Sequence, residues 1–181
     1  MELNIDFINK INNSSLKKIK KHYKFIGEGI ARKVFSLDDK YVIKVAKNED
    51  GYHQNFVERY IYGNCPKHIK KYLCPIYYSN DRIIIMAKAT PYNKIIGRHE
   101  FVNPSDFRPE ENVVDDLKEL INNFHLYTED IFASRSWGVI DGEFYLIDFG
   151  CTSDFGDMYY DGVKSIYYLN KNIDLLTKNI H

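Results

Sequence analysis

An aspartate at the end of a hydrophobic strand is the first candidate for chemistry in this 181-residue sequence. The stretch "FYLIDFG" leads Asp148, Phe149 and Gly150 into a tight bend, so that the carboxylate stands at the end of the strand. Carboxylate oxygens are ligands that Mg²⁺ prefers. A second Asp-Phe-Gly string begins at Asp154, but it follows "CTS" and not a hydrophobic strand, so we expect it to be a chance repeat.

A lysine in the middle of an apolar strand is the second candidate. In "YVIKVA", the alternation of side chains places Lys44 between Val42 and Ala46 on one face of the strand. Small apolar neighbours indicate a covered face, where an ammonium group needs a partner or an anionic ligand. Glu58, in the helix predicted from "HQNFVERYIYGN", is the nearest protein partner.

A glycine-containing turn precedes this strand. The stretch "IGEGIARKVF" places Gly27 and Gly29 between two strands, where backbone N–H groups can approach an anion without a Cβ in the way. It is not a Walker A loop, because no Gly-Lys-Ser/Thr follows, and it is not a Rossmann turn, because no helix opens after it. Taken alone, the motif leaves an ordinary turn as the alternative.

The elements that must position these residues follow in a definite order. Strands are predicted from "YKFIG", "KVFSL" and "KYVIKVAK", then a helix that ends near Gly63, then strands from "CPIYYSN" and "RIIIMAK". A connector spans 90–112, the strongest amphipathic helix is "NVVDDLKELINNFHLY", and Asp141-Gly142 joins a hairpin. This order predicts an α+β fold.

The bulk properties limit the class of protein. The length predicts a single domain, 1–181, with an N-lobe at 23–88 and a reduced C-lobe at 89–181. With 25 basic and 25 acidic residues the formal charge is zero, which argues against a nucleic-acid partner. No apolar run is long enough to cross a bilayer. The stretch "SLKKIKKHYKF" predicts a basic helix capped by Ser15, and we prefer a solvated face there to a membrane-binding role.

Cysteine usage indicates the compartment. Cys65, Cys74 and Cys151 are odd in number and have no paired spacing, and the N-terminus "MELNIDFINK" has no signal pattern. Both observations favour a cytoplasmic location.

Together these features resemble the protein-kinase-like fold. The run from Gly27 through Lys44 to Glu58 resembles its Gly-rich loop, strand-three lysine and helix-C glutamate. "RIIIMAKAT" resembles the fifth strand and the hinge, with Met86 near the gatekeeper position, and "FYLIDFG" resembles the DFG turn. The resemblance spans about residues 23 to 152 and is strongest to small kinase-like proteins of bacteria and their phages.

The resemblance implies a site for ATP and Mg²⁺. Lys44 would pair with the α- and β-phosphates, Glu58 would orient it, and Asp148 would hold the metal. The catalytic residues implied are Asp130, Lys44 and Glu58. The residues implied in cofactor binding are Ile26, Gly27, Glu28, Gly29, Arg32, Val34, Val42, Lys44, Met86, Ala87 and Ala89.

The catalytic loop departs from the kinase pattern. The family places a metal-binding Asn five positions after its catalytic Asp, but counting from Asp130 gives Arg135. Counting back from Trp137 makes Ser136 the Asn equivalent and moves the base position to Ile131. We assign Asp130 as the base and Ser136 as a second metal ligand.

Two further departures from the kinase pattern concern the Gly-rich loop and the C-terminal part of the chain. Arg32 replaces the third glycine of the loop, and the sequence leaves open whether it contacts phosphate, fills the groove or pairs elsewhere. Only 31 residues follow Gly150, with no Ala-Pro-Glu motif, and "DGVKSIYYLNKNIDLLTKNI" predicts one closing helix.

The sequence therefore predicts a minimal kinase-like protein that binds Mg-ATP and transfers its γ-phosphate to a hydroxyl of a protein or small molecule. The alternative is a pseudokinase that acts as a protein-interaction or regulatory module without catalysis. A third reading is an α+β binding domain with a superficial likeness to kinases. The expected partners are a nucleotide and a protein partner or substrate, with no nucleic acid and no membrane.

Overall fold

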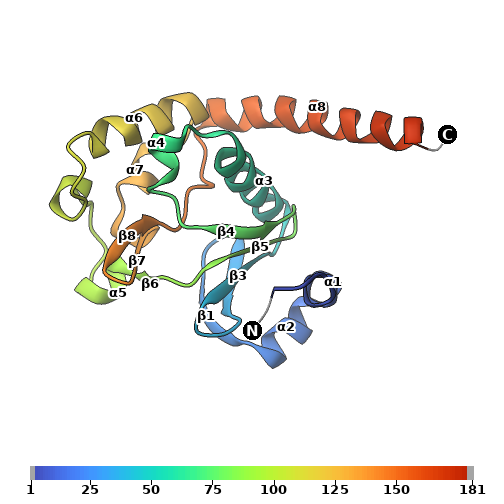
Figure 1. The fold of residues 1–181 in the computed structure, drawn as a ribbon, viewed down its shortest axis with the longest axis horizontal. Coiled ribbons are helices and arrows are strands. Elements are labelled where there is room, and N and C mark those ends of the chain that lie inside the picture. Colours follow the sequence, from blue (N-terminus) through green and yellow to red (C-terminus); the bar gives the residue numbers. More distant parts are fainter. Residues whose placement is uncertain (1–2, 179–181) are drawn as a thin grey trace.

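Five antiparallel strands form the main sheet of the computed structural model, which describes residues 3–178 and the side chains of residues 3–171. The strands are Lys24–Glu28 (β1), Arg32–Ser36 (β2), Tyr41–Ala46 (β3), Ile76–Ser79 (β4) and Ile83–Ala87 (β5). They lie in the order β1-β2-β3-β5-β4 (Figure 1). Lys44 pairs with Val34 and Ile84 in the register, so it lies in the middle of the sheet. The strands predicted from alternation are confirmed.

Two N-terminal helices cover one face of this sheet. They are Ile5–Asn12 (α1) and Leu16–His22 (α2), and their buried residues Ile11 and Ile19 pack against Phe35 and Ile43 of the sheet. The Ser15 hydroxyl accepts the Lys18 N–H at 3.2 Å, so the predicted cap is present. The lysines of α2 are exposed, as expected of a solvated face. The helix α1 was not predicted.

The helix Glu49–Asn64 (α3) lies on the side of the sheet away from α1 and α2 (Figure 1). Asn48 caps it by accepting the Gly51 N–H at 3.2 Å, and two acidic residues in the first turn favour the helix dipole. The helix therefore begins before the stretch predicted from apolar spacing, and it ends one residue beyond Gly63. Its buried residues Asn55 and Glu58 face the sheet.

Gly51 and Gly63 give a matched pair of tests for this packing. A Cβ on Gly51 would collide with the Ala31 carbonyl and lie 2.9 Å from Ala46 Cα, whereas one on Gly63 would meet nothing within 4 Å. Gly51→Ala should lower the free energy of unfolding by about 1–3 kcal/mol through overpacking. Gly63→Ala should raise it by up to about 1 kcal/mol, because alanine is the better helix former. Urea denaturation measures both, and equal effects would contradict the docking of α3 on the β2–β3 edge.

The second half of the chain is mostly helical and carries a small sheet. The strands Thr90–Pro91 (β6), Trp137–Ile140 (β7) and Glu143–Leu146 (β8) form this sheet, and Asp141 and Gly142 have positive φ in the predicted hairpin. The core contains Trp137 and the apolar side of the predicted amphipathic helix, Val113–Phe124 (α6). Three short α-helices and a 3₁₀ turn were not predicted, since three to five residues show no helical period: Lys67–Lys70 (α4), Tyr92–Ile96 (α5), Thr128–Ile131 (α7) and Pro104–Asp106 (η1).

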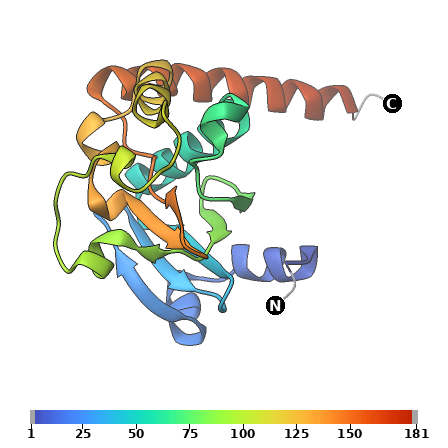
Figure 2. The ribbon, with the colours of Figure 1, turned by 60° about the vertical axis from the view of Figure 1, so that its left-hand side comes forward.

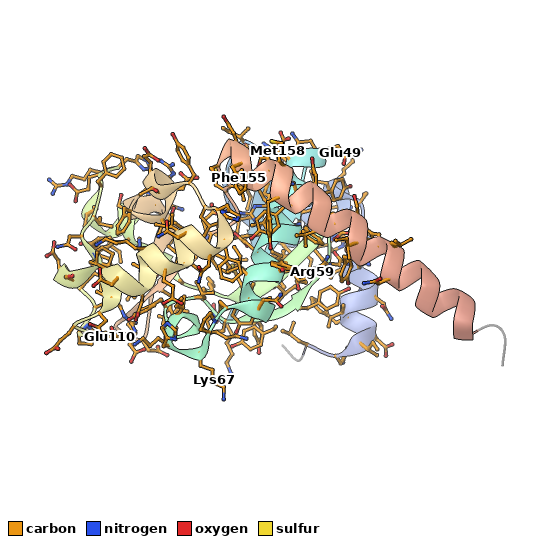
Figure 3. All side chains as sticks on the ribbon, turned by 90° about the horizontal axis from the view of Figure 1, so that it is seen from above. Glu49, Arg59, Lys67, Glu110, Phe155 and Met158 are labelled. Carbon is orange, nitrogen blue, oxygen red and sulfur yellow. The ribbon has the colours of Figure 1, made fainter. Side chains whose placement is uncertain are left out.

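A 25-residue helix, Asp154–Lys178 (α8), ends the described chain. It crosses α3 and extends beyond the rest of the molecule (Figures 1 and 2). The Arg59 guanidinium lies 5.1 Å from the Phe56 ring and 5.2 Å from the Tyr167 ring, where the two helices cross (Figure 3). The predicted closing helix is thus present from Asp154 onward, and residues 179 and 180 of the predicted stretch lie outside the described residues.

The second Asp-Phe-Gly string, which begins at Asp154, forms the first turn of α8. Ser153 caps this turn, because its hydroxyl accepts the Gly156 N–H at 3.2 Å. None of the helices within residues 3–178 has the length and hydrophobicity that a membrane span requires.

Candidate functional site

A buried ion pair joins the middle of the sheet to α3. Lys44 Nζ lies 2.8 Å from Glu58 Oε1 and 3.2 Å from Oε2, and the two residues are 6% and 0% exposed. The covered face predicted for Lys44, and its predicted partner, are both present. Strand alternation and the helical period bring the two side chains together from 14 residues apart.

The turn at Asp148 docks onto this ion pair. Lys44 Nζ donates to the Ile147 carbonyl at 2.7 Å and lies 3.4 Å from Asp148 Oδ1. The Phe149 N–H donates to Glu58 Oε1 at 3.2 Å. A Cβ on Gly150 would lie 2.7 Å from the Gln54 carbonyl oxygen, so only glycine lets the turn pack this closely on α3. The structure thus brings Lys44, Glu58 and Asp148 into one cluster.

Arg32 is the fourth charged residue of this cluster. Its guanidinium donates to Glu58 Oε1 at 2.8 Å, to Asn55 Oδ1 at 3.3 Å and, over a short distance, to Asp148 Oδ1. Of the alternatives that the sequence left open, the structure shows ion pairing within the site. Burial disfavours the charged form of Arg32, but Glu58 and Asp148 outweigh burial and raise its pKa. Asn55 was missed, although it lies one helical turn before Glu58 on the same face.

The two cations also determine the charge of Asp148. Burial opposes its ionisation, but Lys44 and Arg32 outweigh burial and hold the Asp148 pKa well below its usual range. The Asp148 side chain is nevertheless 55% exposed, so the carboxylate is engaged on one side and open on the other. A carboxylate of this kind stays ionised at neutral and mildly acidic pH.

Acid should therefore weaken the site in a defined pH window. Because the pKa of Asp148 is lower in the folded than in the unfolded chain, its contribution to stability is fully present above about pH 4 and is lost as the pH falls further. Urea denaturation between pH 5 and pH 2.5 should show a shallower loss of stability for Asp148→Asn than for the wild type. Parallel pH profiles would show that the carboxylate is not linked to folding.

An apolar cluster lies beside the charged residues and joins the two sheets. Val42, Met86 and Ala87 are buried there. Members that the sequence did not predict include Ile140, which ends β7, and Ile147, which follows β8, both from the second half of the chain. The residues packed against the buried members are Ile26, Val34, Ile76, Ile140, Tyr145 and Ile147. This arrangement places the predicted adenine-binding side chains together.

The predicted hinge is partly occupied by other contacts. The Ala87 N–H donates to the Pro75 carbonyl at 2.9 Å, so it is not free to bind a base. Ala89 is then the remaining backbone candidate of the two, and its role stays a prediction. Lys94 of α5 donates to the Ile26 carbonyl at 3.0 Å and so links the second half of the chain to β1.

The predicted Gly-rich turn has open space around it, but only Gly29 lies between β1 and β2, because Gly27 is part of β1 and pairs with Val34. A Cβ on Gly27 or Gly29 would meet nothing within 4 Å, so the fold itself does not require these glycines. The Glu28 carboxylate lies 3.6 Å from both Lys33 and Lys47. The predicted contact of this turn with phosphate stays a prediction.

The irregular loop places Asp130 in an ion pair. Asp130, in α7, pairs with Arg135, and it also lies beside Cys151, whose pKa is raised to about 12 by burial and by the hydrogen bond to Asp130. Ile131, the alternative base position, is 1% exposed and has no titratable group. The Trp137 indole N–H donates to the Ile131 carbonyl at 2.9 Å and holds the loop in place. Of the two alternative base positions, Asp130 is therefore the one with a carboxylate.

Ser136 lies in the 3₁₀ turn Ser134–Ser136 (η2) beside the Asp148 turn. Its carbonyl accepts the Ile147 N–H at 2.7 Å and the Asp148 N–H at 3.4 Å, which agrees with counting back from Trp137. The Ser136 side chain is buried. Asp148 Oδ1 is already shared by the Arg32 and Lys44 cations. Residues 3–171 contain no group of three or more His, Cys, Asp or Glu placed to hold a metal ion. Asp148 can therefore offer a metal only Oδ2, on a carboxylate that two cations already neutralise, and this donor set does not favour Mg²⁺.

A groove of about 510 Å³ opens between the start of α3, the Asp148 turn and α8. Its wall includes Gly150 and Cys151 on one side, with His53 and Lys164 on the other. Lys164 Nζ lies 2.9 Å from His53 Nδ1, and burial and the Lys164 charge lower the His53 pKa. No sequence pattern indicates this groove, because its walls come from elements about 100 residues apart along the chain.

Comparisons with known proteins give distant structural matches. No family model matches the sequence, and no curated protein is similar to it. A ternary complex of streptomycin, ATP and APH(2'')-IIa aligns over 83% of this chain and 71% of that chain, at 16% identity and a TM-score of 0.42. A gentamicin complex of APH(2'')-IIa aligns over the same shares, at 16% identity and a TM-score of 0.39.

The fold is kinase-like. The five-stranded antiparallel sheet, the helix between its third and fourth strands in sequence, the Lys44–Glu58 ion pair and the Asp148 turn occur in the order that the resemblance implies. The predicted α+β class and the truncated helical second half are confirmed.

Proposed function

We propose that this chain is a kinase-like nucleotide-binding protein that takes up ATP between its two sheets. The observation that carries the proposal is the buried Lys44–Glu58 ion pair held against the Asp148 turn. An anionic ligand is bound well by a cation whose position is already fixed, since little order is lost on binding. Glu58 orients the ammonium group in this way.

The neighbouring apolar cluster supports the same function. A base inserted among these side chains would contact residues from both sheets, and small-ligand sites are typically lined by apolar side chains with a few fixed polar groups. The phosphates would then lie toward Lys44, below Gly27 of β1 and Gly29 of the turn that follows it. The specificity for adenine stays a prediction from the sequence.

Phosphoryl transfer is a second candidate function of the same site. Asp130 lies beside Cys151, directly after the Asp148 turn, and would accept the proton of a hydroxyl group on a protein or small molecule. The ion pair with Arg135 and the serine at position 136 favour the opposite alternative, a regulatory module that binds nucleotide without catalysis. A protein partner and a cytoplasmic location remain predictions.

A thermal-shift assay followed by a turnover assay separates these functions. ATP at about one hundred times its Kd should add about 2.7 kcal/mol of stability. That corresponds to a rise in melting temperature of roughly 5–10 °C for a chain of this size. No shift at millimolar ATP, with or without magnesium, would contradict nucleotide binding.

The turnover assay then follows the labelled γ-phosphate of ATP. Its appearance on an acceptor or in free phosphate, with loss of this signal but not of the thermal shift in Asp130→Asn, would establish transfer. A thermal shift without release of label would establish binding without catalysis.

A further inference from the structure

The charged residues of the site form a neutral set of four. Lys44 and Arg32 carry two positive charges, and Glu58 and Asp148 carry two negative charges. Without Arg32, the same three residues would carry one net negative charge and would attract a cation. With Arg32 present, a divalent cation gains no net attraction from the set, while a polyanion meets no net repulsion.

Arg32 is held in the site by its surroundings. It is 4% exposed, and its guanidinium contacts three acceptors: Asn55 and Glu58 on α3, and Asp148 on the turn. A guanidinium stays charged at any pH at which proteins fold, and its planar fork suits carboxylates. Arg32 is therefore a permanent counter-charge for Asp148, where an exchangeable metal ion would otherwise be needed.

The partners of Asp148 also leave little coordination for a metal. Its Oδ1 is already bound by Arg32 and lies 3.4 Å from Lys44 Nζ. The other predicted ligand, Ser136, is a buried hydroxyl. A hard ion such as Mg²⁺ bound at the open Oδ2 would share one carboxylate with Arg32 and Lys44 and would be repelled by both cations.

We propose that the site binds a nucleoside triphosphate without a divalent metal, with Arg32 as the built-in counter-charge that lets the phosphates lie beside Asp148. This inference rests on the proposed nucleotide binding and adds that the binding requires no divalent metal. Arg32 acts as a positioning residue, through Asp148 and Glu58.

The test is the Kd of ATP for the full chain, measured by titration calorimetry in EDTA and in millimolar MgCl₂. For the wild type, the two values should differ by less than about tenfold, or 1.4 kcal/mol. In Arg32→Gly, which restores the glycine of the kinase pattern, ATP should bind more than about tenfold more weakly in EDTA than in MgCl₂. Mg²⁺ titrated alone should give heat with this variant and none with the wild type.

Two control variants assign the effect to the charge at position 32. Lys33→Gly removes a cation from the next position of β2, where the side chain pairs with Glu28 outside the cluster, and should behave as the wild type. Arg32→Lys keeps the positive charge and should retain binding in EDTA, and it also serves if Arg32→Gly does not fold.

The outcomes separate this inference from the proposed function. Wild-type binding that needs Mg²⁺, or equal binding in EDTA by the wild type and Arg32→Gly, would overturn the role of Arg32 and leave nucleotide binding standing. Absence of binding in both buffers would overturn nucleotide binding itself.

Discussion

Replacing Glu58 by alanine should lower the free energy of unfolding by about 3–5 kcal/mol, because it leaves buried cations without their counter-charge. Glu58 is fully buried and accepts hydrogen bonds from Lys44, Arg32 and the Phe149 N–H. It therefore joins β2, β3 and the Asp148 turn at one carboxylate. Its loss would leave Asp148 as the remaining carboxylate of the cluster.

Urea denaturation at neutral pH measures this effect, and two variants serve as controls. Glu58→Gln keeps the shape of the side chain and removes only its charge, so it should also be strongly destabilising. Glu119→Ala removes a carboxylate that is 42% exposed and pairs with His68, and it should cost no more than about 1 kcal/mol. Similar losses for Glu58→Ala and Glu119→Ala would show that the buried cluster does not hold the two halves together.

Replacing Lys44 by methionine should weaken ATP binding by roughly 30-fold or more, which corresponds to about 2 kcal/mol. Methionine keeps the apolar stem of the side chain and removes the ammonium group that we place on the phosphates. The fold should tolerate the change better than the loss of Glu58, because Arg32 still pairs with Glu58 at 2.8 Å. The variant thus separates a loss of binding from a loss of structure.

Titration calorimetry of ATP into the purified variant measures the change in Kd. Lys40→Met is the matched control: it removes an exposed lysine immediately before the same strand and should leave the Kd unchanged. If Lys44→Met binds ATP as tightly as the wild type while remaining folded, the phosphates do not lie at Lys44.

Much of the fold could be predicted from the sequence because its signals are local. The alternation in "YVIKVA" placed Lys44 on the covered face, and the Asp-Gly pair located the β7–β8 hairpin. The partner of Lys44, Glu58, could be predicted because it lies in the helix that directly follows the strand of Lys44. The start of α3 was missed by apolar spacing, although its cap, Asn48, is a local signal.

The contacts of Arg32 and α8 could not be predicted, since they depend on residues far apart in the chain. Arg32 and Asp148 are separated by 116 positions, and no periodicity relates them. The crossing of α8 over α3 depends on Arg59 lying between the Phe56 and Tyr167 rings, which only the packed fold brings together. The loop at Asp130 was irregular in sequence, and its ion pair with Arg135 is a local contact that spacing alone did not show.

The most direct test of the central claim is titration calorimetry of ATP into the wild-type chain, carried out both in EDTA and in MgCl₂. The structure predicts saturable binding at one site per chain, and loss of that binding in Lys44→Met. Absence of binding heat at millimolar ATP in both buffers, from a protein shown to be folded by its cooperative unfolding, would contradict a nucleotide site at Lys44.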